Sequence, residues 1–301
     1  MLEPLSPLTS EPLTVPAPVA VVMITLNESH NMEAVLKNLE GWAQEIFVVD
    51  SFSRDDTVDI ALRHGAHVVQ RRFQGFGDQW NFALENMPIS APWTMKLDPD
   101  ERLTNELKLQ LAKGIAMDEA DGFSMQRRLW FMSQPLPIRQ EIVRVWKTGY
   151  CRFSDVLVNE HPIVKGQVSH VDGEIEHHDS PDLEHWLDKQ NRYSTAEAIA
   201  RADGHPLSGN PRLFGSSFER RMWLKFNFQR LPFRYAFLFF YHWILQGAWR
   251  AGWPGYVWAR LRSDVMRLRQ YKHREIELTG CRPSKRIYGV GKPDPRVRNF
   301  D

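Results

Sequence analysis

Apolar runs with the composition of buried strands constrain this 301-residue chain more than any other feature. Val19–Ile24 and Glu45–Val49 are rich in β-branched and apolar residues, as expected for strands covered on both faces of a parallel sheet. Between them, apolar residues recur on one helical face at Met32, Val35, Leu36 and Leu39. Strands that alternate with helices in this way predict an α/β fold with a mostly parallel sheet.

The same alternation continues along the chain. We expect a helix, a strand, a helix and a strand in turn at Thr57–His64, Ala66–Val69, Gly75–Asn86 and Trp93–Leu97. Asn27, Asp50 and Asp98 follow three of the strands. Because ligands bind beyond the carboxyl ends of the strands in such sheets, we expect these three polar residues to meet at one binding edge.

Two carboxylates stand one residue apart after the last of these strands, in the segment Leu97–Glu101. Asp98 and Asp100 could hold a divalent cation that prefers oxygen ligands and that also bridges a diphosphate. Such a cation would offset the charge that builds on a leaving nucleoside diphosphate. A plain acidic loop is the alternative, because this spacing of aspartates is common by chance.

The loop after the second strand, Val48–Thr57, is also acidic and rich in hydroxyl groups. Asp50 could accept a hydrogen bond from a base N–H of a nucleotide. Asp55 or Asp56 could cap the next helix near Thr57. The alternative is that all of these residues serve as caps and turns, although Asp50 continues directly from a buried run.

The C-terminal part of the chain is basic and aromatic. Residues 201–286 contain 17 lysines and arginines against 5 acidic residues, which suggests an anionic surface as partner. Tyr235–Leu245 is an apolar run about half the ~20 residues needed to span a bilayer. Trp249, Trp253 and Trp258 follow it, and this pattern predicts an interfacial helix or shallow hairpin in the headgroup layer. The alternative is an aromatic core helix pair with solvated arginines.

The sequence also indicates how the chain divides into domains and in which cellular compartment it lies. We expect a disordered tail over residues 1–17, a main domain over 18–200, a helical membrane-associating region over 201–282 and a loose tail over 283–301. Cys151 and Cys281 give no disulfide framework and no metal-binding cysteine pair. The N-terminal residues lack the basic and apolar segments of a secretory signal, so we expect a cytoplasmic chain.

Four segments, in order, resemble the motifs of family 2 glycosyltransferases, most closely the branch that includes bacterial lipopolysaccharide-core β-glucosyltransferases. They are Ile24–Glu28, Val49–Thr57, Gly75–Leu84 and Leu97–Leu103. The resemblance extends over roughly residues 19–275. It implies a GT-A fold, a nucleotide-diphospho-sugar donor, Mg²⁺ or Mn²⁺, and inversion at the anomeric carbon. One departure is Phe52, which stands where a small residue, often glycine, is usual.

The resemblance also implies roles for individual residues. The donor-binding candidates are Thr25, Asn27, Glu28, Asp50, Ser53, Asp55, Gln79 and Asp98. The metal-ligand candidates are Asp100 and His178, where His178 matches the family position better than its neighbour His177. An inverting transfer needs a general base near the acceptor hydroxyl, and Glu160 is the candidate, with Asp155 as the alternative.

These expectations together indicate an inverting, metal-dependent glycosyltransferase. Its acceptor would be lipid-linked, a lipopolysaccharide or a polysaccharide, and the chain would be peripheral on the inner face of the cell membrane. A polyisoprenyl-phosphate glycosyltransferase is one alternative, and it would need no general base because a phosphate oxygen is already ionised. A non-catalytic membrane-docking protein is another, but it would not need Asp98, Asp100 and Glu160 together. No nucleic-acid partner is expected.

Overall fold

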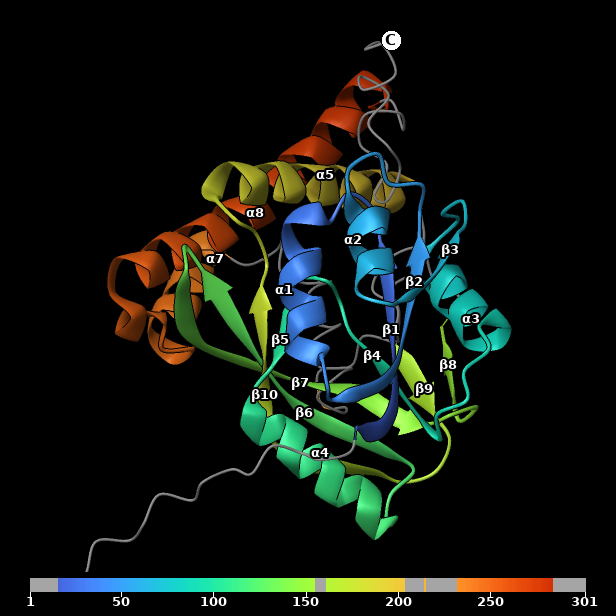
Figure 1. Cartoon of the computed structure of the whole chain (residues 1–301). Coiled ribbons are helices and arrows are strands. Elements are labelled where there is room, and N and C mark those ends of the chain that lie inside the picture. The colour runs from blue at the N-terminus through green and yellow to red at the C-terminus, as the bar shows by residue number, and fades with distance from the viewer. Residues whose placement is uncertain (1–15, 155–160, 204–213, 215–231, 284–301) are drawn as a thin grey trace, which may run out of the picture. The chain divides into compact units, whose positions relative to one another are not determined.

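A computed structural model describes residues 16–154, 161–203, 214 and 232–283 (Figure 1). The chain divides into two compact units. Unit 1 comprises residues 1–99, 103–125 and 142–174, and unit 2 comprises residues 100–102, 126–141 and 175–301. We describe each unit separately.

Unit 1 is built on four parallel strands, as the sequence predicts. They are β1 (Ala17–Thr25), β2 (Ala43–Asp50), β3 (His67–Gln70) and β4 (Trp93–Lys96). β1 lies between β2 and β4, and its register pairs Thr25 with Asp50 at the carboxyl ends of the two strands. Val19–Met23 of β1 and Phe47–Val49 of β2 are buried, so side chains cover both faces of these two strands.

Helices pack on the parallel strands of unit 1. The predicted apolar face of α1 (Ser29–Leu39) is buried, and α1 lies beside α2 (Thr57–Arg63) in front of β1 and β2 (Figure 1). α3 (Phe76–Asn86) buries Trp80 in a core cluster with strands β1 and β2. Two further elements follow, the short hairpin of β8 (Cys151–Phe153) with β9 (Pro162–Val164), and α4 (Asn105–Met117).

The larger sheet is mixed. Its eight described strands follow the order β3-β2-β1-β4-β7-β6-β10-β5, where β5 is Glu101–Leu103, β6 is Gly122–Phe131, β7 is Gln134–Lys147 and β10 is Val168–His178. β7 pairs antiparallel with β4. A curled sheet with a parallel half, flanked by helices, confirms the expected α/β class and the GT-A-like architecture.

Unit 2 contains the C-terminal helices. They are α5 (Leu183–Ala202), α7 (Arg234–Phe240), the π-helix η2 (Tyr241–Leu245), the 3-10 helix η3 (Ala248–Ala251) and α8 (Gly252–Thr279). α5 packs along α8 (Figure 1) and runs through the boundary expected at residue 200. The core of unit 2 joins Trp186 and Trp258 to Leu136. Within the described residues, no helix combines the length and apolar character needed to cross a membrane.

The junction between η3 and α8 requires a glycine at position 255. At Gly255 a Cβ atom would stand 1.8 Å from the carbonyl oxygen of Ala248, a distance that no side chain can occupy. Glycine therefore allows the backbones of η3 and α8 to approach each other closely.

Candidate functional site

Asp50 organises the loops that follow β1 and β2. Thr25 Oγ1 donates to Asp50 Oδ1 over 2.9 Å, the backbone N–H of Ser53 donates to Oδ2 over 2.8 Å, and Gln70 Nε2 donates to Oδ2 over 3.0 Å. The Ser53 hydroxyl donates to Oδ1 as well. Asp50 is fully buried, and these four donors match the acceptor capacity of a carboxylate. The structure therefore shows Asp50 as the centre of a protein network, here called the Asp50 network, in which every acceptor position faces a protein donor.

A second set of hydrogen bonds joins the starts of α1 and α2. Asp55 Oδ2 accepts from the N–H of Ser29 over 3.0 Å, and Oδ1 accepts from the N–H of Thr57 over 3.2 Å. The N–H of Glu28 donates to Thr57 Oγ1 over 2.8 Å. Burial raises the pKa of the Asp55 carboxyl, but the hydrogen bonds from Thr57 and Ser29 outweigh it and lower that pKa. Asp55, rather than Asp56, satisfies the first amide of α2.

Two non-glycine residues in these loops adopt left-handed backbone conformations. Asn27 has a φ of 55°, and its side-chain oxygen accepts from the N–H of Arg54 over 2.9 Å. Phe52 has a φ of 62° and is 45% exposed. A glycine reaches this region without a steric cost, which explains in physical terms why a phenylalanine is an unusual choice there.

Gln79 connects α3 to the same loops. Its side chain is fully buried, Nε2 is 3.4 Å from Ser51 Oγ, and Oε1 accepts from Arg71 over 2.8 Å. Arg71 also pairs with Asp78 on α3. Gln79 thus holds the loop after β2 against α3.

Asp98 lies opposite a buried arginine. Arg144 Nη2 on β7 donates to Asp98 Oδ2 over 2.9 Å, and the Arg144 side chain is 6% exposed against 30% for Asp98. One oxygen of Asp98 is therefore already engaged by a guanidinium, which was not foreseen from the sequence.

Asp100 belongs to a different cluster, which lies within unit 2. Potential ligand atoms of Asp100, His177 and Asp179 all lie within 4.8 Å of one another. His177 Nε2 is 3.3 Å from Asp100 Oδ2 and 3.9 Å from Asp179 Oδ1. Asp100 Oδ1 is buried and has no hydrogen-bond partner among the described residues. Two carboxylates, one imidazole and a carboxylate oxygen with spare capacity fit a divalent cation such as Mn²⁺.

The electrostatics of this Asp100–His177–Asp179 group are strongly coupled. Burial raises the pKa of the Asp100 carboxyl, but the charges of His177 and Lys189 outweigh it and hold that pKa well below its usual range. Burial likewise lowers the pKa of His177, and the neighbouring Asp100 more than compensates, so the pKa is raised. The Asp100 and Asp179 carboxyls, whose pKa values are both lowered, are therefore ionised across the physiological pH range.

The two adjacent histidines face different surroundings, because successive residues of a strand point to opposite faces. His177 lies beside Asp100, whereas the ring of His178 stacks on Trp130 with centroids 4.6 Å apart, and its Nε2 is 3.3 Å from Glu176. Only the backbone of His178 contacts Asp100, through an N–H···O bond of 2.7 Å. His177, and not His178, therefore lies in the group with Asp100 and Asp179, and a metal-binding role for His178 stays a prediction.

Two predicted residues cannot be placed relative to the Asp50 network or the Asp100–His177–Asp179 group, and two residues of that second group and its surroundings were not predicted from the sequence. Glu160 and Asp155 lie outside the described residues, so the candidate base stays a prediction. Asp179 is not among the residues predicted from the sequence, although it directly follows the two histidines. Lys189 carried no signal, because it lies ten positions further along in α5.

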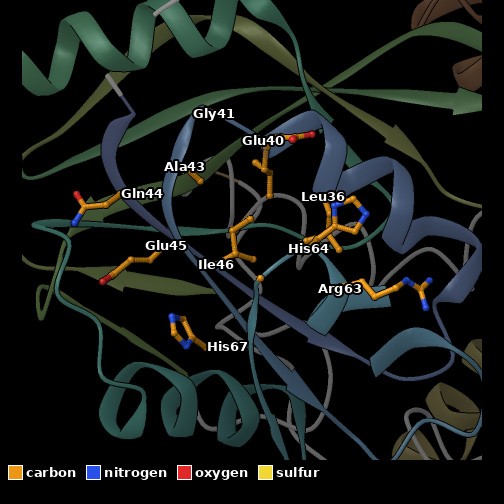
Figure 2. A pocket seen from close by; sticks show the side chains of 12 residues that line it. Leu36, Glu40, Gly41, Ala43, Gln44, Glu45, Ile46, Arg63, His64 and His67 are labelled. Atoms are coloured by element: carbon orange, nitrogen blue, oxygen red, sulfur yellow. The ribbon is translucent and has the colours of Figure 1, made fainter. Parts of the chain in front are cut away.

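A separate cavity lies at the amino ends of β2 and β3, whereas the Asp50 network lies at their carboxyl ends. It has a volume of about 490 Å³ and is lined by the end of α1, the start of β2, the end of α2 and the start of β3 (Figure 2). Its polar side chains come from Glu40, Gln44, Glu45, Arg63, His64 and His67.

Comparison with known families accounts for the residues at the carboxyl ends of the strands. Residues 20–164 match the sequence model of the family described as Glycosyl transferase family 2. The chain contains a family 2 glycosyltransferase domain. The Asp50 network, Asp98 and Asp100 all lie inside the residues matched by this family model.

Individual relatives are consistent with this family. The lipopolysaccharide core biosynthesis glycosyltransferase LpsC of Rhizobium meliloti is 28% identical over 253 residues, which cover 80% of this chain and 86% of that protein. An uncharacterised glycosyltransferase of Rickettsia typhi is 26% identical over 196 residues, which cover 60% of this chain. The alignment spans 66% of the Rickettsia protein, just under two thirds of its length.

Two solved structures are also similar. Residues 1–349 of S. aureus TarS align with a TM-score of 0.42 and 14% identity, covering 87% of this chain and 92% of that chain. The glucosyl-3-phosphoglycerate synthase of Mycobacterium tuberculosis, in complex with Mn²⁺, uridine-diphosphate-glucose and phosphoglyceric acid, aligns with a TM-score of 0.29 and 26% identity. That alignment covers 37% of this chain and 43% of that chain.

Proposed function

We propose that this glycosyltransferase transfers a sugar, with inversion, from a nucleotide-diphospho-sugar to a lipid-linked or lipopolysaccharide-type acceptor at a membrane surface. The observation that carries the proposal is the Asp50 network at the carboxyl ends of β1 and β2, inside a family 2 domain. The carboxyl edge of a parallel sheet is where such folds bind ligands.

The donor nucleotide would bind the loops that the Asp50 network orders. Hydrogen bonds within the protein hold Thr25, Asn27, Glu28 and Ser53 at these loops, while Asp55 and Gln79 fix the loop positions. Because protein donors already surround Asp50, a base N–H would bind this carboxylate only by replacing one of them. Gln70 is the member of the network contributed by β3, and its amide is the donor that a base could replace.

The Asp100–His177–Asp179 group would hold the divalent cation, which supplies Lewis-acid stabilisation of the departing nucleoside diphosphate. A donor set with one imidazole favours Mn²⁺ over Mg²⁺, because Mg²⁺ prefers oxygen ligands in near-ideal octahedral geometry. Asp98 would act on the donor through its position opposite Arg144 rather than as a cation ligand.

Glu160 would take the proton from the acceptor hydroxyl on the side opposite the leaving group. A base is needed because a hydroxyl is a poor nucleophile until its proton is removed. This role rests on the resemblance in sequence, since the residue lies outside the described part of the chain.

The acceptor side of the proposal is supported by an exposed apolar surface in unit 2. We call it the aromatic surface, and its members are Phe237, Phe240, Ile244, Leu245, Trp249 and Trp253, each more than half exposed. Exposed apolar groups clustered in this way mark interaction sites, and tryptophans beside arginines suit the headgroup layer of a membrane. Trp258, in contrast, is buried in the core of unit 2, so only part of the aromatic segment is available to lipid.

A donor-hydrolysis screen across nucleotide sugars with Mn²⁺, run with and without membrane lipid extract, tests the proposal. We expect slow hydrolysis of one donor class and faster, product-forming turnover when lipid extract is present. Turnover with a polyisoprenyl phosphate alone, unaffected by Glu160→Gln, would instead identify the chain as a polyisoprenyl-phosphate glycosyltransferase. Absence of hydrolysis and of transfer for every donor would overturn the enzymatic assignment.

A further inference from the structure

The Lys189 ammonium lies among the oxygens that a divalent cation would need. Its Nζ is 3.3 Å from Asp100 Oδ2 and 2.9 Å from Asp179 Oδ1, and it donates to the backbone oxygen of Asp179 over 3.1 Å. Asp100 Oδ2 is also the oxygen that lies 3.3 Å from His177 Nε2. The lysine ammonium therefore occupies carboxylate lone pairs that a bound cation would also need.

The lysine is held in this position. Its side chain is 22% exposed. Lys189 lies on α5, the helix that follows β10 in the chain, and Asp179 lies in the short connection between the two. The Lys189 ammonium has three N–H donors, and three oxygens lie within reach of it: Asp100 Oδ2, Asp179 Oδ1 and the backbone oxygen of Asp179.

A divalent cation and this ammonium would repel each other. Few-ångström separations between like charges are unfavourable wherever water is largely excluded. Lys189 offsets one of the two carboxylate charges of Asp100 and Asp179, which weakens the attraction of the group for a doubly charged ion. A nucleoside diphosphate would add the negative charge that the group lacks.

We propose that Lys189 is a built-in counter-ion that competes with the divalent cation for Asp100 and Asp179, so that the cation binds together with the anionic nucleoside diphosphate rather than before it. This inference rests on the proposed function, because it concerns the same cation group. It makes Lys189 a positioning residue that sets the order of binding.

Titration of Mn²⁺, followed by the electron paramagnetic resonance signal of the free ion, tests the competition. We expect Lys189→Met to bind Mn²⁺ alone about 10-fold or more tightly than the wild type, a typical effect of a residue next to a metal site. Lys189→Arg keeps the charge and should bind Mn²⁺ as weakly as the wild type. Added UDP should strengthen Mn²⁺ binding much more in the wild type than in Lys189→Met.

The outcomes separate this inference from the proposed function. Mn²⁺–UDP binding by the wild type, with unchanged affinity for Mn²⁺ alone in Lys189→Met, overturns the competition and leaves the cation group in place. Absence of Mn²⁺ binding in both proteins, with or without UDP, overturns both proposals.

A second measurement uses the wild-type protein and does not depend on the folding of a variant. Displacement of the ammonium should raise its accessibility, so saturating Mn²⁺ with UDP should increase acetylation of Lys189 several-fold, as read by peptide mass spectrometry. Lys272, whose Nζ is bonded to Asn191 and Thr195, serves as the internal reference. Unchanged acetylation of Lys189 at a Mn²⁺ and UDP concentration that saturates the titration would overturn the inference.

Discussion

Arg144 donates to the Asp98 carboxylate over 2.9 Å from a position in which only 6% of its own side chain is exposed. Asp98→Ala removes the anion opposite a buried guanidinium. We expect a loss of about 1–3 kcal/mol in the free energy of unfolding, because a buried charge loses an anionic partner. Urea denaturation measures it, and Asp98→Asn, which keeps an acceptor oxygen, should lose less. Equal stability of Asp98→Ala and the wild type would show that the pair contributes nothing.

Asp100→Ala should behave differently. The two remaining charges, Asp179 and Lys189, balance each other, so we expect the variant to stay folded while Mn²⁺-dependent binding of a nucleoside diphosphate is lost. Calorimetric titration of UDP with Mn²⁺ gives the readout. The matched control is Asp118→Asn, which changes an exposed carboxylate whose backbone φ of 51° an asparagine also tolerates. Unchanged UDP affinity in Asp100→Ala would remove Asp100 from the cation group.

Phe52 offers a test of stored backbone strain. Phe52→Gly should raise the free energy of unfolding by about 0.5–1 kcal/mol, because glycine avoids the left-handed penalty but costs more conformational entropy on folding. Phe52→Ala removes the same ring and keeps the penalty, so it should give no such gain. If the alanine variant is stabilised as much as the glycine variant, the ring rather than the backbone is the source of the effect.

Glu160→Gln tests the general base. The change keeps the shape and hydrogen bonding of the side chain and deletes its basicity, so we expect transfer to fall by roughly 10²-fold or more while donor affinity is kept. Steady-state transfer and UDP titration on the same preparation separate the two. Full transfer activity would move the role to Asp155.

The aromatic surface should bind lipid by burial of apolar area. Phe240→Ser with Leu245→Ser should weaken co-sedimentation with anionic liposomes at every salt concentration, because salt does not screen apolar burial. Leu62→Ser with Met117→Ser, which removes two equally exposed apolar residues from unit 1, is the matched control. Phe239 is unsuitable for this test, because it packs against Trp243 and Tyr256.

The basic residues that precede the aromatic segment in the sequence should act mainly at low salt. Arg220, Arg221 and Lys225 lie outside the described residues, and their charge reversal is expected to cost about 1 kcal/mol of lipid attraction per charge near the surface. Wild-type protein that stays in the supernatant throughout the salt series would show that lipid is not the partner.

The sequence predicts the parallel half of the sheet well, because buried strands and amphipathic helices leave different periodicities. It also predicts that Asn27, Asp50 and Asp98 follow strands that end at a ligand-binding edge. It does not predict that Thr25, Ser53 and Gln70 surround Asp50, since those contacts depend on the register between three strands.

The choice between neighbouring residues is equally hard to make from sequence. His177 and His178 differ only in the face of β10 to which they point, and a shift of one residue in register exchanges them. Lys189 and Arg144 reach their carboxylates from elements far away in the chain, so no local pattern marks them.

The contact at Gly255 has a consequence for the tryptophans on either side of it. Trp249 precedes the junction of η3 with α8 and Trp253 follows it, so both side chains project from a corner locked by direct backbone approach. The backbone that carries these two side chains is already fixed, so it has little conformational freedom left to lose when the side chains enter a membrane. Insertion of these two indoles would therefore cost less entropy than ordering a flexible segment, and more of the transfer free energy would appear as affinity.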